Sequence, residues 1–69
     1  MEFHIEYEQE EDGRWLAEVP EMPGALAYGA TAEEAMSRAE ALALRALAEQ
    51  LETRESRPQA FSIRFAAVA

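Results

Sequence analysis

Apolar and polar side chains alternate strictly over residues 2–8, and a second alternating stretch covers residues 15–19. A period of two residues with β-prone apolar side chains is typical of a strand that buries one face. The polar segment between the two stretches contains Asp12 and Gly13, a pair that favours a tight turn because glycine readily takes a positive φ. The pattern therefore predicts an antiparallel hairpin. Its apolar positions are Phe3, Ile5 and Tyr7, followed by Trp15, Ala17 and Val19.

Two shorter stretches of the chain predict further strands. A proline-glycine pair at 23–24 suits the centre of a type II turn, and residues 25–28 follow it as a third strand. Towards the C-terminus, apolar side chains alternate again over residues 61–65, which predicts a fourth strand. In the third strand the pattern is too weak to show whether Leu26 and Tyr28 point inward.

A long run of good helix formers extends from Thr31 to about residue 54. Thr31 and Glu34 have the spacing of a capping box. In that motif the threonine hydroxyl accepts from the backbone N–H of the glutamate, and the carboxylate accepts from the backbone N–H of the threonine. Pro58 disfavours helix before it, so we expect the helix to end by about residue 56. The face that repeats at helical spacing is mostly alanine and consists of Ala32, Ala35, Met36, Ala39, Leu42, Ala43, Ala46 and Leu47.

The predicted element order, β-β-β-α-β, belongs to the α+β fold class. A right-handed crossover through the helix places the fourth strand beside the first strand and parallel to it. We therefore expect a mainly antiparallel four-stranded sheet in the order 3-2-1-4, with one helix on one face. The opposite face then has no cover from within the chain. The length of 69 residues predicts a single domain over residues 1–69.

The composition narrows the classes of function. Fourteen acidic and six basic residues give a net charge of -8, which repels phosphate groups, so we expect no direct binding of nucleic acid. No apolar run approaches the roughly 20 residues that a membrane span needs, and the N-terminal residues lack the features of a signal peptide. Because the chain also has no cysteine, we expect a cytoplasmic protein. A domain this short has a thin core, so self-association is an expected source of further stability.

Few residues suggest catalysis. Glu2, Glu6 and Glu8 line one face of the first predicted strand beside the single histidine, His4. They could in principle hold a metal ion, but a solvated strand face explains them more simply. The serines have no basic partner nearby in the sequence, and the three glycines form no phosphate-binding loop. We therefore predict no enzyme activity and no cofactor.

Two segments of the sequence have a more specific pattern. Residues 12–24 contain, in order, an acidic residue with glycine, an aromatic residue, alanine, valine with proline, an acidic residue, an apolar residue, and proline with glycine. Residues 29–35 continue as Gly-x-Thr-x-Glu-Glu-Ala at the start of the predicted helix. This ordered set resembles the pattern of the HicB family, and the resemblance covers most of residues 3–50.

The resemblance implies a partial RNase H-like fold and an antitoxin-like function. HicB proteins commonly bind and block HicA, a small basic toxin that cleaves mRNA, and their RNase H-like domain generally lacks nuclease carboxylates. Many also carry a C-terminal DNA-binding domain, which we do not expect here. The leading hypothesis is a HicB-like antitoxin that neutralises a HicA-like basic toxin by occlusion. One alternative is an orphan homo-oligomeric binding or scaffold protein of the same family. Another, a residual metal-dependent nuclease, rests on the number of acidic residues alone.

Surface residues suggest where subunits or partners bind. Leu44 and Leu51 lie outside the alanine-rich face and share one line along the helix, either as flanking leucines or as a seam for a second subunit. The fourth predicted strand has no proline or lysine to guard its edge. We therefore expect a homodimer or higher oligomer. The candidate protein-interface residues are Leu16, Leu44, Leu51, Phe61, Ile63 and Phe65.

Overall fold

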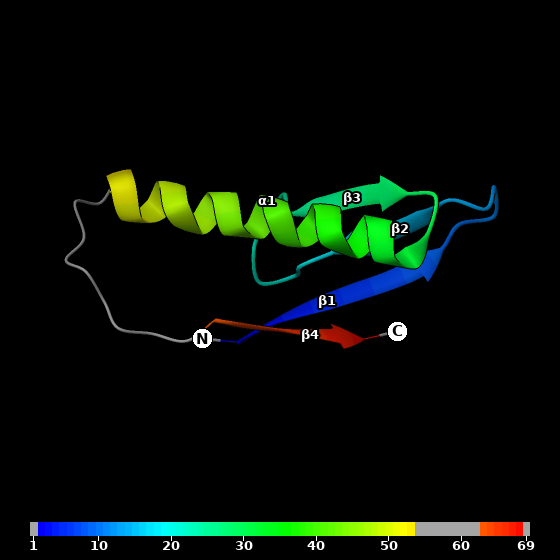
Figure 1. Ribbon diagram of the computed structural model, residues 1–69, viewed down its shortest axis with the longest axis horizontal. Helices are drawn as coiled ribbons and strands as arrows, with labels where there is room; N and C mark the ends of the chain where they lie inside the picture. Colours follow the sequence, from blue (N-terminus) through cyan, green and yellow to red (C-terminus); the bar gives the residue numbers. More distant parts are fainter. Residues whose placement is uncertain (1, 54–62, 69) are drawn as a thin grey trace.

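A computed structural model of the chain describes residues 2–53 and 63–68. Its elements are β1 (Glu2–Gln9), β2 (Trp15–Glu18), β3 (Leu26–Gly29), α1 (Ala32–Thr53) and β4 (Arg64–Val68). The four strands form one sheet in the order β3-β2-β1-β4, and α1 lies on one face of it (Figure 1). The neighbouring pairs are antiparallel except β1 and β4, which are parallel. The predicted fold class, strand order and single helix are confirmed.

The fourth strand is displaced along the sequence from its prediction. β4 begins at Arg64, whereas the alternation predicted residues 61–65, and it continues through Val68. Ile63 lies just before the strand, and Phe61 falls outside the described residues. The parallel register pairs Phe3 with Phe65, and their rings stack with centroids 5.4 Å apart. Beyond Phe65, β4 continues beside β1 with two alanines. These residues have no apolar-polar alternation, so the sequence pattern did not predict this part of the strand.

The core lies between α1 and the inner face of β1, β2 and β3. Three alanines of the helix are completely buried at this contact, which lets the helix backbone lie close to the sheet. Gly29 shows how close this packing is, because an added Cβ there would lie 2.6 Å from the backbone nitrogen of Ala35. The buried core residues are Phe3, Ile5, Ala17, Val19, Met22, Ala25, Ala35, Ala39 and Ala43. Trp15 and Tyr7 pack against this cluster, as the hairpin pattern predicts.

Only one of the two hydrogen bonds of the predicted capping box forms at the start of α1. The backbone N–H of Glu34 donates to the Thr31 hydroxyl at 3.1 Å, as the capping-box spacing predicts. The reciprocal bond from the backbone N–H of Thr31 is not formed. Instead, the Glu34 carboxylate pairs with Arg38 one turn later at 2.8 Å. Arg38 also donates to the backbone carbonyl of Tyr28 at 2.8 Å, which ties the helix to β3.

The connection between β2 and β3 is a compact turn. The backbone N–H of Ala25 donates to the carbonyl of Met22 at 3.0 Å, and Gly24 between them has a φ of 89°. This geometry is that of the predicted type II turn. The N–H of Val19 donates in addition to the carbonyl of Ala25 at 2.9 Å, which closes the connection at its base. Met22 and Ala25 are buried as a result.

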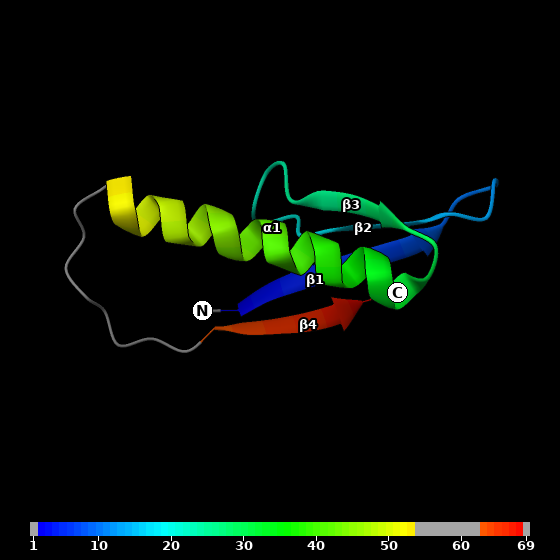
Figure 2. The same ribbon diagram turned by 45° about the horizontal axis from the view of Figure 1, so that its top comes forward.

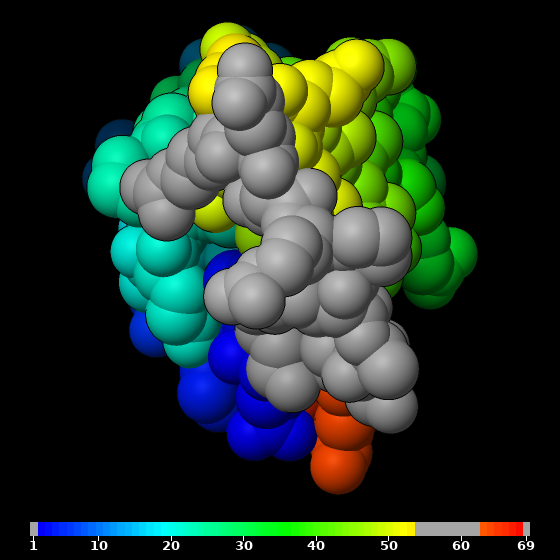
Figure 3. Space-filling view, turned by 90° about the vertical axis from the view of Figure 1, so that its left-hand side faces the viewer, coloured from blue at the N-terminus to red at the C-terminus, as the bar shows by residue number. Residues whose placement is uncertain are grey.

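The helix covers only part of the sheet. Figure 2 shows β1 passing beneath α1, while β4 lies at the edge beyond it. In the end-on view of Figure 3, the beginning of β4 (orange) lies beside that of β1 (blue), away from α1 (yellow and green). Among the described residues, no element covers the face of the sheet opposite α1.

No helix in the described part of the chain combines the length and the apolar character needed to cross a membrane.

Candidate protein-binding surface

The described elements leave the face of the sheet opposite α1 uncovered, and we call it the open face. Side chains alternate between the two faces of a strand, so every second residue points towards it. On β1 and β2, the residues between the buried ones are mainly acidic. The open face consists of Glu2, His4, Glu6, Glu8, Leu16, Glu18, Leu26, Tyr28, Arg64, Ala66 and Val68.

Three glutamates gather in the middle of the open face. Glu6 lies directly opposite Glu18 in the antiparallel pair, and Glu8 follows on the same side of β1, opposite Leu16. Like charges directly opposite each other destabilise a sheet. Within residues 2–53 and 63–68, no cation forms an ion pair with these three carboxylates. The open face therefore carries a concentration of negative charge that a cationic partner would neutralise.

A shallow depression of about 270 Å³ lies among these carboxylates. Its walls combine charged and apolar side chains, because Leu16 and Val68 border it together with the three glutamates and Tyr7. Lysine and arginine side chains combine an apolar stem with a charged head. The depression therefore matches the chemistry of a basic surface better than that of a purely apolar one.

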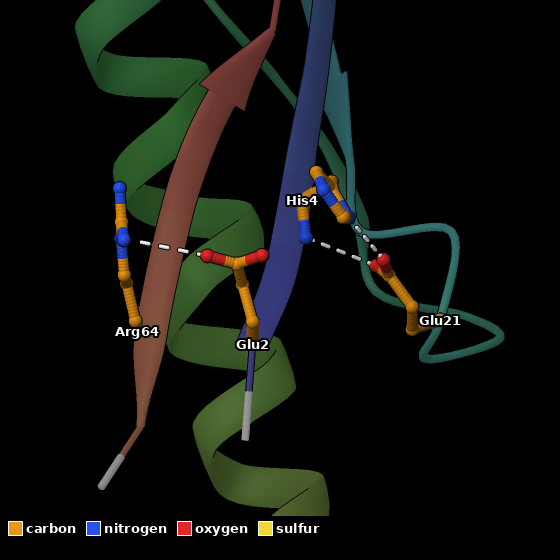
Figure 4. A network of polar contacts seen from close by, with 4 residues as sticks. All are labelled: Glu2, His4, Glu21 and Arg64. Atoms are coloured by element: carbon orange, nitrogen blue, oxygen red, sulfur yellow. Dashed lines mark hydrogen bonds and ion pairs between the residues drawn. The ribbon is translucent and has the colours of Figure 1, made fainter.

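Two ion pairs that involve residues of β1 lie beside these three glutamates (Figure 4). The Arg64 guanidinium lies 3.5 Å from the Glu2 carboxylate, which connects β4 to β1 across the open face. On the other side of β1, Nδ1 of His4 lies 2.5 Å from Oε2 of Glu21. The backbone N–H of His4 donates to Oε1 of the same carboxylate at 3.0 Å. Glu21 is therefore held by two contacts to one residue.

The contact between His4 and Glu21 shifts both pKa values. The hydrogen bond and the charge of the Glu21 carboxylate raise the pKa of His4 above its ordinary value of 6.5. The hydrogen bonds from the imidazole and the backbone N–H of His4 lower the pKa of Glu21 to about 2. Both side chains are partly exposed, at 46% and 35%. The pair stabilises the charged form of each partner.

Apolar side chains lie beside the charges of the open face. Leu26 is 47% exposed, Val68 43% and Tyr28 39%. The guanidinium of Arg14 lies over the Tyr28 ring, 4.4 Å from its centroid. Asp12 holds that guanidinium at 2.8 Å. The backbone N–H and the side chain of Arg14 together lower the pKa of Asp12 below its ordinary value.

The predicted interface residues are spread over different surfaces. Leu16 lies on the open face, where it borders the depression. Ile63 is 38% exposed just before β4. Phe65 is partly buried and packs against the core, where it stacks on Phe3. Phe61 lies outside the described residues.

The leucines of the helix flank are exposed as their spacing predicts, Leu44 at 43% and Leu51 at 41%. Arg38 shows which flank of α1 faces β3, because it bonds to Tyr28. Leu44 follows Arg38 by six residues, which at about 100° per residue places it on the other flank. The two leucines therefore lie on the side of α1 that is turned away from β3.

The pair of His4 and Glu21 is the part of this surface that the sequence did not reveal. The register between β1 and β2 ends at Glu6 and Glu18, and Pro20 follows. Proline has no N–H to continue a ladder, and the Glu21 carboxylate binds the backbone N–H of His4 at that end. The sequence signal for this contact is a glutamate that directly follows the proline ending a strand.

The carboxylates of the surface do not form a metal centre in the described residues. Within residues 2–53 and 63–68, no three histidine, aspartate or glutamate side chains lie in a group that could hold a metal ion. Glu2 and His4 are each engaged by a different partner, Arg64 and Glu21.

In comparisons with known proteins, no protein family, curated protein or solved structure gave a significant match to this chain.

Proposed function

We propose that this protein is a binding module for a small basic protein, and that it acts as an antitoxin-like inhibitor by covering the partner's functional surface. The observation that supports this most directly is the cluster of carboxylates at Glu6, Glu8 and Glu18, which within residues 2–53 and 63–68 have no ion-pair partner and lie on a sheet face that no described element covers. The resemblance to the HicB family indicates the class of partner, a HicA-like basic toxin that cleaves mRNA.

The proposed mechanism is steric and electrostatic. A protein that binds RNA needs a basic surface for the phosphate groups. The carboxylates of the open face would pair with those basic side chains, and Leu16 and Val68 would pack against their stems. RNA would then be excluded from the partner. The net charge of -8 accelerates the encounter of the two proteins at low salt.

The proposal assigns this chain no reaction of its own. It includes no catalytic residue, no cofactor and no direct contact with nucleic acid. It includes a cytoplasmic location, because the mRNA on which a HicA-type toxin acts is found there. It also treats residues 1–69 as one HicB-like domain.

Co-expression tests the proposed function. The probe is the product of a small basic gene that neighbours the gene for this chain, expressed alone and together with it. The expected result is growth arrest by the basic protein alone, relief of that arrest by co-expression, and a purified complex of the two proteins. If no such gene exists, or if co-expression neither relieves growth nor yields a complex, the proposed function is wrong.

A second candidate function is that of an orphan homo-oligomeric scaffold protein of the same family. The exposure of Leu44 and Leu51 on one flank of α1 favours it, because two leucines on one line form a seam for a second subunit. A stable dimer or tetramer without any basic partner is the expected property. Self-association and partner binding use different surfaces in this account, so a chain can show both.

A further inference from the structure

The two outer strands of the sheet differ in how their backbones are engaged. β3 is tied to the helix, because Arg38 of α1 donates to the carbonyl of Tyr28 at 2.8 Å. β4 is the other outer strand and pairs with β1 along its whole length. In the part of the chain that the structure describes, no side chain and no other backbone group is hydrogen-bonded to the outer edge of β4.

The sequence of β4 leaves this edge open to another strand. Natural sheet edges are commonly protected by proline, by lysine, by a bulge or by a covering element. β4 reads Arg-Phe-Ala-Ala-Val and pairs with β1 in an unbroken register. Its only charge, on Arg64, is paired with Glu2. The small side chains of Ala66 and Ala67 allow a neighbouring strand to approach closely.

The surroundings of β4 define what an added strand must carry on each face. On the open face, Ala66 is paired with His4 of β1, and Glu6 is paired with Val68. Neighbouring strands lie about 4.8 Å apart, so an added strand would lie about 10 Å from β1. A lysine or arginine lying beside Val68 can span that distance together with the carboxylate of Glu6, the β1 residue that is paired with Val68. This face therefore favours basic residues.

The face of β4 on the helix side has the opposite character. Phe65 is partly buried by its stack on Phe3, but Ala67 is exposed, because α1 lies over β1, β2 and β3 rather than over β4 (Figures 1 and 2). Apolar side chains of an added strand would cover Phe65 and Ala67 there. A strand that suits both faces therefore alternates basic and apolar residues.

We propose that the outer edge of β4 binds an extended segment of the basic partner as a fifth strand, with lysine or arginine alternating with apolar residues. This assignment rests on the proposed function and identifies the edge at which its partner docks. Backbone hydrogen bonds to β4 supply the pairing, and the carboxylates of β1 select basic side chains. A second copy of the chain suits this edge less well, because each copy carries a net charge of -8.

Three capped hexapeptides test the assignment without the natural partner. The first alternates lysine and valine, the second has three lysines followed by three valines, and the third is the alternating peptide with an N-methyl group on every residue. All three have the same charge, but the second lacks the alternation of basic and apolar side chains, and the third has no backbone N–H on either edge with which to pair. We expect the first peptide to slow hydrogen exchange of the outward amides within residues 64–68 at least about tenfold, and the other two to leave exchange unchanged.

Matched variants locate the binding site. Ala66→Lys introduces a positive charge on β4 and is expected to weaken the alternating peptide about tenfold, whereas Ser37→Lys on the exposed surface of α1 leaves binding unchanged. The assignment is overturned if the alternating peptide gives no protection, or if all three peptides bind alike. Protection that rises with protein concentration in the absence of peptide also overturns it, because the edge then binds a second copy.

The complex with the co-expressed basic partner separates this inference from the proposed function. If no complex forms, the proposed function fails. If a complex forms but the amides of β4 exchange as in the free protein, only the edge assignment fails. Slowed exchange at β4 within a purified complex supports both.

Discussion

The carboxylate of Glu21 accepts two hydrogen bonds from His4, one from Nδ1 of the imidazole at 2.5 Å and one from the backbone N–H at 3.0 Å. These contacts join the connection between β2 and β3 to the first strand, beyond the point where the register of β1 and β2 ends. The buried Met22 follows Glu21 directly. The pair therefore holds a loop whose apolar side chain completes one end of the core.

The contribution of this pair to stability depends on pH in a defined window. The pKa of His4 is raised above 6.5 in the folded protein, so its contribution is complete below 6.5 and is lost as the pH rises through the folded-state value. The pKa of Glu21 is lowered from 4.5 to about 2, so its contribution is complete above 4.5 and is lost as the pH falls towards 2. Both partners contribute fully between 4.5 and 6.5.

Urea denaturation of the wild type and of Glu21→Gln across the pH range checks this prediction. The difference in the free energy of unfolding is expected to be largest between pH 4.5 and 6.5 and to shrink on both sides. NMR titration of the His4 ring should give a pKa that returns towards 6.5 in the variant. A control, Glu52→Gln at an exposed position of α1, should show no such window. A difference that is flat with pH would show that the pair does not act in solution.

The close contact between α1 and the sheet predicts that larger residues are not tolerated there. Ala39 is completely buried. Leucine at this position must push the helix away or adopt a strained rotamer, so Ala39→Leu is expected to lower the free energy of unfolding by about 1–3 kcal/mol. Ala48→Leu places the same side chain at an exposed position of the same helix and should change it by less than about 0.5 kcal/mol. Equal effects in urea denaturation would show that the helix is not closely packed.

The leucine seam on α1 predicts a defined effect of charge on self-association. Burial of two leucines contributes on the order of 3–6 kcal/mol before the costs of ordering. Leu44→Glu and Leu51→Glu are each expected to weaken self-association at least about tenfold in sedimentation equilibrium. Gln50→Glu adds the same charge on the same helix and should have a smaller effect. If the wild type sediments as a monomer at micromolar concentration, the two leucines do not form a seam. If the variants remain oligomeric, the subunits associate through another surface.

The sequence predicted those parts of the fold that local chemistry determines. Alternation over residues 2–8, the Pro-Gly pair before β3 and the threonine before α1 each specify an element by themselves, and the structure has all three. The strand order followed from the handedness of the crossover and is confirmed. The register of β4 could not be predicted in this way. It depends on where Phe65 meets Phe3, a contact between residues far apart in the chain.

The candidate site was predicted only in part. The sequence indicated an uncovered face with Leu16 among acidic residues, but not which acids face each other. That Glu6 lies opposite Glu18 depends on the length of the turn between their strands, which sets the register. The weak alternation of β3 left the orientation of Leu26 and Tyr28 open, and both are exposed on the open face.

Binding of the purified basic partner to charge variants of the open face tests whether this face is the binding surface. Glu6 and Glu18 repel each other in the free protein, so replacing both with glutamine is not expected to lower its stability. Any loss of binding is then a loss of contact.

Isothermal titration calorimetry should compare the wild type with the double variant Glu6→Gln, Glu18→Gln and with a control double variant, Glu49→Gln, Glu52→Gln. Both variants change the net charge equally, but the control residues lie on the last turns of α1. We expect the open-face variant to bind at least about tenfold more weakly, while the control keeps nearly wild-type affinity. Equal affinity of the wild type and the open-face variant, or an equal loss in both variants, would contradict it.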